Sequence, residues 1–139
     1  MYSTEDYKNI DDSTDCIFER SNQQLLVNRT QRNLLIKSEV TKSYEFLYNI
    51  LLENEVVDYD SLHINNEYIK FFSSETFYIL LKNAISEWVT YNKNAQKMNE
   101  RIRCELCGYP IFYACTILNI KNANILRVGR SCASVFRLL

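Results

Sequence analysis

The spacing of apolar side chains predicts helices over much of the first hundred residues. The clearest pattern follows Ser73 and Ser74, where apolar residues recur every three or four positions. This stripe comprises Phe77, Leu80, Leu81, Ala84, Ile85, Trp88 and Val89. Such a period is typical of one buried helix face, and we expect this helix to continue to about residue 98.

Earlier segments carry shorter patterns. Ser38 is placed to cap a second helix, whose apolar face collects Val40, Tyr44, Leu47 and Leu51. A short helix is also expected over about 22–36. The pair Asn65-Asn66 stands between short apolar stretches and fits either a hairpin turn or a link between helices.

The pattern changes at Cys104, after which strands are expected. The stretch "YPIFYACTIL" is typical of a strand, "NIKNAN" of a turn and "ILRV" of a second strand. The following "SCASVFRLL" predicts a short helix. Both glycines of the chain, Gly108 and Gly129, fall in this part.

These patterns together predict an α+β chain that is mainly helical. Residues 1–20 are acidic, have no apolar period and are expected to form a flexible tail. Residues 21–100 are expected to form a helical body. Residues 101–139 are expected to form a small module, in which a β-hairpin is followed by a short helix.

Composition narrows the class of protein. Hydrophobic residues make up 47% of the 139 residues, which is enough to bury a core. No apolar run approaches the length of a membrane span, and the acidic start resembles no secretory signal, so we expect a cytoplasmic protein that does not enter membranes. In that reducing compartment, the five cysteines indicate metal ligands or small core side chains rather than disulfides.

Cys104 and Cys107 have the spacing of a metal knuckle, in which two thiolates and a tight turn hold one ion. Gly108 permits the left-handed backbone that such a turn prefers. Zinc takes four ligands in a tetrahedron, so a second half-site is needed. Cys132 is placed to supply it, because it enters the first turn of the predicted last helix, where a helix N-terminus stabilises a thiolate.

The fourth ligand has several candidates. Cys115, on the first predicted strand, is close in sequence and of the right type, but a cysteine there could equally be a small core side chain. His63, the one histidine, and Cys16 are more remote alternatives. The zinc ligands that we expect are Cys104, Cys107, Cys115 and Cys132.

The stretch "CELCGYPI…ILRVGRSCASVF" resembles the short treble-clef-like zinc modules of phage, mobile-element and bacterial proteins. Those modules combine a CxxCG knuckle, a hairpin and a VGxxC segment that enters a helix. The matching residues are Cys104, Cys107, Gly108, Gly129 and Cys132. The resemblance covers residues 104–139 and implies a zinc-finger fold there. Such modules often use a histidine or a second helix cysteine, and residues 104–139 contain neither.

A bound zinc could serve several purposes. A module this small has too little core to fold unaided, so the ion could serve only to stabilise its fold. A catalytic zinc would need three protein ligands, a water and a general base, and histidine is nearly absent. A redox-active CxxC would need a thioredoxin-like strand and helix around it. We therefore favour a structural or binding zinc.

The net charge of −1 conceals a segregation of charge, because residues 1–22 and 43–87 are mainly acidic and residues 93–139 mainly basic. The basic residues are Lys93, Lys97, Arg101, Arg103, Lys121, Arg127, Arg130 and Arg137. The aromatic residues among them are Tyr109, Phe112, Tyr113 and Phe136. Arginine beside exposed rings is suited to holding phosphates and stacking bases. Alternatively, the arginines solvate the module while the rings pack inside it.

We therefore expect a non-enzymatic zinc-binding protein whose basic module contacts DNA or RNA, such as a phage, mobile-element or bacterial accessory factor. Its helical body would bind a protein partner or a second copy of the chain. The alternative is a protein-binding adaptor or inhibitor of a host nucleic-acid machine, in which acidic surfaces imitate phosphates and the zinc is purely architectural.

Those acidic surfaces are the tail together with Glu53, Glu55, Asp58 and Asp60. The same pairs, "ENE" and "DYD", could hold magnesium for phosphodiester chemistry. No second metal-binding cluster or positioned base accompanies them in the sequence, so we expect that the protein is not an enzyme.

Overall fold

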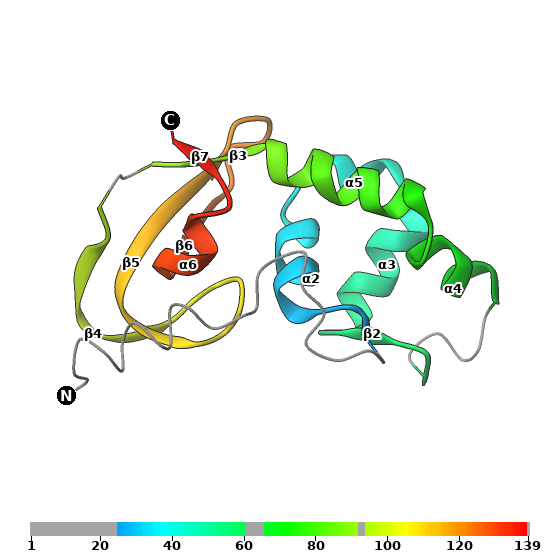
Figure 1. Cartoon of the computed structure of the whole chain (residues 1–139), viewed down its shortest axis with the longest axis horizontal. Coiled ribbons are helices and arrows are strands. Elements are labelled where there is room, and N and C mark those ends of the chain that lie inside the picture. Colours follow the sequence, from blue (N-terminus) through cyan, green and yellow to red (C-terminus); the bar gives the residue numbers. More distant parts are fainter. Residues whose placement is uncertain (1–24, 61–65, 92–93, 139) are drawn as a thin grey trace.

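The computed structural model describes residues 25–60, 66–91 and 94–138, which form a helical lobe beside a sheet lobe (Figure 1). The tail expected over residues 1–20 lies outside the described residues. In chain order the elements are β1 (Leu25–Val27), α2 (Arg29–Ile36), η1 (Val40–Ser43), α3 (Glu45–Glu53), β2 (Val57–Asp58), α4 (Asn66–Phe72), α5 (Glu75–Ser86), β3 (Trp88–Thr90), β4 (Gln96–Arg103), β5 (Pro110–Asn119), β6 (Ile125–Val128), α6 (Arg130–Ala133) and β7 (Arg137–Leu138).

The chain is not mainly helical, so that expectation is wrong. Helices account for 42% and strands for 30% of the described residues. The helix expected to reach residue 98 ends at Ser86 as α5, and Trp88–Thr90 continue as strand β3. Aromatic and β-branched side chains suit a strand. The apolar residues Trp88 and Val89 therefore continue the helical period by coincidence.

The helical lobe, residues 25–86, also departs from expectation at its start. The helix expected over 22–36 begins at Arg29, because Asn28 forms a capping box that starts α2 there. Before it, Leu25–Val27 pair with β2 as a short strand. Of the Asn65-Asn66 pair, Asn66 is the first residue of α4, and Asn65 lies outside the described residues.

Ser38 was expected to cap a helix and does not. The 3-10 turn η1 comes first, and α3 begins only at Glu45, with no side-chain cap. The Ser38 hydroxyl instead donates a hydrogen bond to the Leu34 backbone oxygen (2.7 Å) and accepts one from Trp88 Nε1 (2.9 Å). The serine is therefore the partner of the indole N–H of buried Trp88, and both polar groups are satisfied in the core.

Glu87, between α5 and β3, joins the two lobes. Only 1% of it is exposed. Its Oε1 accepts hydrogen bonds from the Glu39 N–H (2.7 Å) and from Asn119 Nδ2 (2.8 Å), and its Oε2 accepts one from the Val40 N–H (2.9 Å). Its backbone oxygen accepts a fourth from the Ile120 N–H (2.8 Å). One buried carboxylate thus ties η1 to the end of β5.

The sheet lobe, residues 88–138, is built on β5. Strands β3 and β4 both pair antiparallel with β5, β3 along residues 117–119 and β4 along residues 110–114. Strand β6 pairs antiparallel with residues 115–118, and β7 runs parallel to β3. Within the described residues this makes a five-stranded sheet. The two predicted strands of the hairpin are confirmed as β5 and β6. The helix expected after them is shorter than predicted, because α6 ends at Ala133 and Arg137–Leu138 pair with β3 as strand β7.

The sheet includes two strands, β3 and β4, that precede the knuckle in the sequence. Strand β4 spans Gln96–Arg103 and so crosses the division predicted at residue 101. Strand β3 lies between β5 and β7, although its residues were expected to be helical. The C-terminal module is therefore one part of a larger sheet.

Alternation along β5 gives the sheet two faces. We call the face that carries Tyr113, Cys115 and Ile117 the inner face. Thr90, in register with Ile117, donates its hydroxyl to the Ala133 backbone oxygen (3.1 Å), so α6 packs against this inner face. The opposite, outer face carries the alternate residues of β5. Strand β6 shows the same division, because its residues are alternately exposed and buried.

Candidate metal centre and basic sheet face

The knuckle lies in the turn between β4 and β5. Its backbone is closed by two hydrogen bonds, from the Gly108 N–H to the Cys104 oxygen (2.9 Å) and from the Cys104 N–H to the Tyr109 oxygen (2.8 Å). Gly108 has φ +83°, the left-handed conformation that the sequence predicts for it. This tight turn directs the side chains of Cys104 and Cys107 toward one point.

Cys132 approaches that point from α6. The Glu105 N–H donates to the Arg127 oxygen (2.9 Å), and Glu105 Oε1 accepts from the Arg127 N–H (3.0 Å). These two bonds fix the knuckle beside the end of β6. Gly129 follows, and its N–H donates to Cys104 Sγ (3.4 Å). The chain then enters α6, which carries Cys132.

The three sulfur atoms lie within 4.8 Å of one another. Thiolates bonded to zinc at about 2.3 Å in a tetrahedron would lie about 3.8 Å apart, so this spacing suits a single ion. Cys104 and Cys132 are buried, and Cys107 is half-buried. Among the described residues, this is the one group of three or more cysteine, histidine or acidic side chains that could hold a metal.

The pKa values of the three thiols differ because the three side chains share hydrogen bonds. Hydrogen bonds from the Cys107 thiol, the Cys132 thiol and the Gly129 N–H lower the pKa of Cys104 to about 2. The hydrogen bond to Cys104 raises the pKa of Cys107 to about 11, and those to Cys104 and Cys107 raise the pKa of Cys132. One thiolate is thus stable here, but three buried negative charges are not. A bound divalent cation would supply the missing positive charge.

Cys115 is not part of this cluster. It stands on β5 in register with Val128, is 4% exposed, and lines a pocket of about 510 Å³ on the inner face. The other two candidates for the fourth ligand, Cys16 and His63, lie outside the described residues. The structure therefore brings together three of the four predicted ligands, which leaves one tetrahedral position for another donor.

The knuckle also contacts the helical lobe, which the sequence patterns do not reveal. Asn33 Nδ2 donates to the Leu106 backbone oxygen (2.7 Å), and Leu106 is fully buried. Arg29, at the start of α2, lies against Gly108. Since both contacts come from the first turns of α2, the knuckle forms part of the boundary between the two lobes.

Replacing Gly108 by alanine is expected to lower the free energy of unfolding by about 1–2 kcal/mol, because a Cβ is strained at positive φ. The added Cβ would also lie 3.2 Å from Arg29 Nη1, the far end of a flexible side chain. Chemical denaturation of the zinc-loaded protein measures the loss. The same change in an Arg29→Ala background should cost as much. A cost that disappears in that background would identify crowding by Arg29 as the cause.

The eight predicted nucleic-acid contacts separate into groups. Arg101, Arg103, Arg127 and Arg137 lie on strands of the sheet and are exposed. Lys97 is in register with Tyr113 on the inner face, and Arg130 stacks on the Tyr113 ring at 5.6 Å. Lys121 follows β5 in the turn before β6, and Lys93 lies outside the described residues.

Register places the four arginines on the outer face. Arg127 is in register with Thr116 of β5, and Arg137 with Val89, which is itself in register with Leu118. The Arg101 guanidinium lies 5.2 Å above the Phe112 ring. Arg103 is in register with Pro110 and donates to the Gly108 oxygen (3.0 Å). The sequence places these residues close along the chain, but only the register puts them on one face.

The aromatic residues named from the sequence have different surroundings. Phe112 is half-buried on the outer face, whereas Phe136 is 6% exposed and belongs to the core. Tyr109 is 40% exposed beside the knuckle. Tyr91, which no sequence pattern singles out, is 56% exposed and donates its N–H to the Thr116 oxygen (2.7 Å), so it adjoins the outer face.

The acidic residues of the helical lobe were considered as magnesium ligands. Glu55 pairs with Arg29 (3.6 Å), and the acidic residues between 53 and 60 form no three-ligand group in the described chain.

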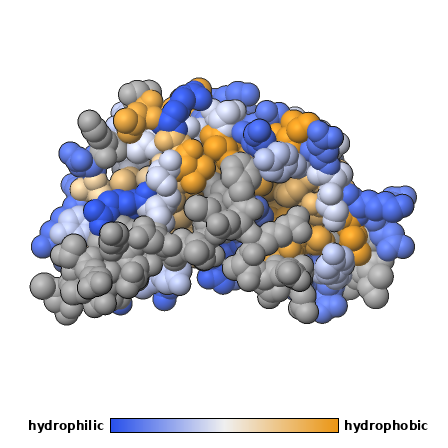
Figure 2. Space-filling model, viewed as in Figure 1, coloured by the Kyte–Doolittle hydropathy of each residue, from blue (hydrophilic) through white to orange (hydrophobic). Residues whose placement is uncertain are grey.

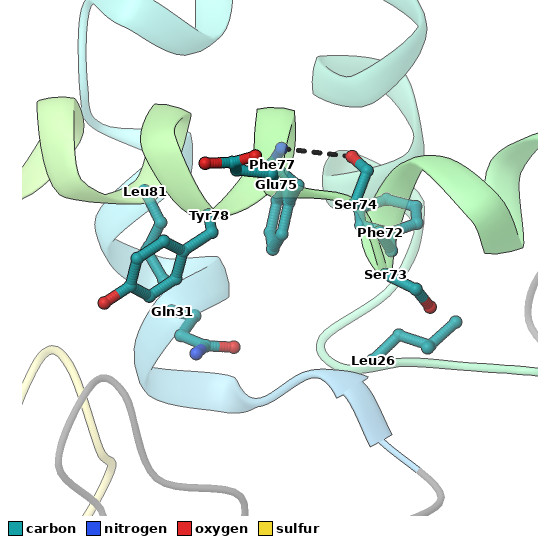
Figure 3. A pocket seen from close by; sticks show the side chains of 9 residues that line it. All are labelled: Leu26, Gln31, Phe72, Ser73, Ser74, Glu75, Phe77, Tyr78 and Leu81. Atoms are coloured by element: carbon teal, nitrogen blue, oxygen red, sulfur yellow. Dashed lines mark hydrogen bonds between the residues drawn. The ribbon is translucent and has the colours of Figure 1, made fainter.

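A pocket of about 330 Å³ lies between β1, α2 and α5, with Leu81 and Tyr78 along one side (Figure 3). Its Ser74 hydroxyl accepts from the Phe77 N–H (3.3 Å) and so acts as a helix cap.

On the side of the molecule that Figure 2 shows, the coloured hydrophobic residues are dispersed. Figure 2 shows hydrophobic residues in several small groups on this side of the molecule, separated by hydrophilic ones. Among the described residues, no helix combines the length and the apolar character that crossing a bilayer requires.

No protein-family model matches this chain, and no curated protein and no solved structure matches it. The treble-clef resemblance therefore stays a prediction carried by the residues of the knuckle and of the segment that enters α6. The function of the chain is inferred from its own geometry.

Proposed function

We propose that this chain is a non-enzymatic zinc-binding protein whose outer sheet face contacts nucleic acid. The zinc would bind at Cys104, Cys107 and Cys132 and join the knuckle to α6. The ion would thereby hold β4, β5 and β6 in the arrangement that places the arginines together.

The donor set supports zinc. Three cysteine sulfurs are soft ligands, and zinc and iron–sulfur centres are the common biological occupants of thiolate sites. The knuckle followed by a distant third cysteine fits a single zinc. A structural role is favoured because the sulfurs are largely buried and are tied to two elements that are far apart in sequence.

One observation carries the nucleic-acid part of the proposal. Four exposed arginines share a sheet face with an aromatic ring, and one of them, Arg101, already lies over that ring, Phe112. Among the residues that the structure describes, few acidic groups lie near this face: Glu100 is on β4, and Glu105 accepts from the Arg127 N–H. A face with this charge attracts phosphates, and guanidinium groups bind them through paired donors.

Replacing Arg101 and Arg127 together by glutamine is expected to weaken binding of the zinc-loaded protein to a fluorescein-labelled oligonucleotide at least tenfold. The plot of log K against log salt should become shallower by about 1.4 for single strands or 1.8 for duplex, since two phosphate contacts are lost. Fluorescence anisotropy over a range of salt concentrations measures both quantities.

Lys70→Gln with Lys82→Gln removes the same charge from the helical lobe and is the matched control. Its binding and its salt dependence should equal those of the parent protein. Equal losses in the two double variants would indicate a non-specific charge effect, and binding that is unchanged in the arginine variant would contradict the proposed contact face.

A further inference from the structure

We propose that the outer sheet face takes single-stranded nucleic acid, with bases stacked on the Tyr91 ring and on the Arg101 guanidinium that lies over Phe112. This inference rests on the proposed function and adds which form of nucleic acid the face accepts. It follows from how rings and guanidinium groups are arranged along β5.

The face presents a ring and a guanidinium group at two levels of β5, in two different arrangements. At the first level, the Arg101 guanidinium lies over the Phe112 ring. At the second, Tyr91 and Arg127 flank Thr116, because Tyr91 bonds to the Thr116 oxygen from β3 while Arg127 is in register with Thr116 from β6. Each level therefore offers one ring and one guanidinium group.

The spacing of these levels suits an extended strand. Phe112 and Thr116 are four residues apart on β5, which corresponds to about 13 Å along the sheet. Thr116, which lies between Tyr91 and Arg127, is half-buried and has a small side chain. A single strand laid along β5 could place one base on the Tyr91 ring and another on the Arg101 guanidinium, while its phosphates meet the edges of the guanidinium groups.

A duplex would use this face poorly. Paired bases are stacked on one another and do not present their flat sides, so rings on the protein would gain nothing. Proteins that read duplex DNA commonly place a basic helix or ribbon in the major groove. Among the described helices, α6 is one turn long, and both arginines of α2 already make contacts, Arg29 with Glu55 and Arg32 with the Leu51 oxygen (2.9 Å).

The test compares a fluorescein-labelled oligothymidine of twelve nucleotides (about the site size of one small single-strand-binding domain) with a mixed duplex of the same length. The full-length zinc-loaded protein is used, and both probes are titrated at one salt concentration by anisotropy. We expect the single strand to bind at least tenfold more tightly than the duplex.

Removing either ring should weaken single-strand binding and leave the salt dependence unchanged. Phe112→Leu and Tyr91→Leu keep apolar bulk but lose the flat ring, and each is expected to weaken binding roughly fivefold to a hundredfold. Phe112→Tyr should retain binding. Tyr78→Leu, at a tyrosine that is 50% exposed on the helical lobe, is the control and should have no effect.

Each variant is first checked for zinc content and melting temperature. If Phe112→Leu does not fold, Tyr91→Leu decides the question, since that side chain is largely exposed. Duplex binding equal to or tighter than single-strand binding would overturn the inference. So would ring variants that bind like the parent while the arginine variant is weakened, and in that case the proposed function still stands. If the parent protein binds neither probe, both this inference and the proposed function are contradicted.

Discussion

Cys104→Ser is expected to lose stoichiometric zinc and to lower the melting temperature by at least 10 °C. Serine is not ionised at neutral pH and is a poor zinc ligand, so the site would keep two thiolates. Structural zinc contributes an apparent binding energy on the order of 10 kcal/mol in small domains. For a chain of this length a loss of 1 kcal/mol lowers the melting temperature by about 3–4 °C. Elemental analysis and calorimetry measure the two effects.

Cys115→Ser is the matched control, because it removes a buried thiol of the same lobe that lies outside the cluster. It should keep its zinc and lose little stability. Cobalt substitution adds an independent reading, since thiolate-to-cobalt absorption scales with the number of bound sulfurs. A parent protein that is purified without metal and still melts cooperatively at the same temperature would contradict the metal centre.

Glu87→Gln is expected to lower the free energy of unfolding by about 2–4 kcal/mol, although the two side chains have nearly the same shape. The amide replaces one carboxylate oxygen by an NH₂ group. On the Oε2 side that group would face the Val40 N–H, and on the Oε1 side it would face the Glu39 N–H and the Asn119 amide. Two donors then meet without an acceptor in a buried site, which costs the desolvation of at least one of them.

Asn119 cannot relieve this by rotating its amide. Its Oδ1 already accepts from the Lys121 N–H (2.8 Å) and the Asn122 N–H (3.2 Å). Urea denaturation measures the loss, and Glu39→Gln serves as control, because Glu39 carries an exposed carboxylate in a surface ion pair with Lys42 (3.4 Å). A Glu87→Gln variant as stable as Glu39→Gln would show that the carboxylate does not join the lobes.

The parts of the fold that could be predicted from the sequence are those governed by local chemistry. Gly108 was expected at positive φ because a CxxC turn needs it, and Cys132 was expected at the cluster because it follows a hairpin at the right distance. Both features depend on a few neighbouring residues. The strands β5 and β6 were visible for the same reason, since β-branched and aromatic residues there are bounded by turn residues.

The parts that could not be predicted depend on residues distant in sequence. Trp88 and Val89 fit the helical stripe as well as a strand, and the pairing with β5 and β7 decides between the two. Periodicity carries no information about such partners. The prediction that Ser38 caps a helix was wrong for the same reason. Its hydroxyl accepts a hydrogen bond from the indole of Trp88, which is distant along the chain.

Cys115 shows a further limit of spacing arguments. Its distance along the chain from Cys107 allows it to be a ligand, but its position on β5 turns it toward α6 and the inner pocket. A strand offers each side chain only one of two directions, so one residue of register decides whether a cysteine can reach an ion. That register is set by the whole sheet.

The order in which the paired segments of the chain leave the ribosome affects how this protein folds. Segments of the helical lobe emerge one after another, whereas β3 pairs with β7 and the knuckle meets Cys132 only after most of the sheet has been made. Until then the nascent chain presents an unpaired strand edge and two reactive thiols, both of which invite association with other chains. If the three cysteines hold zinc as proposed, its capture would be a late event in biogenesis, and zinc scarcity would prolong the period during which the nascent chain is prone to aggregate.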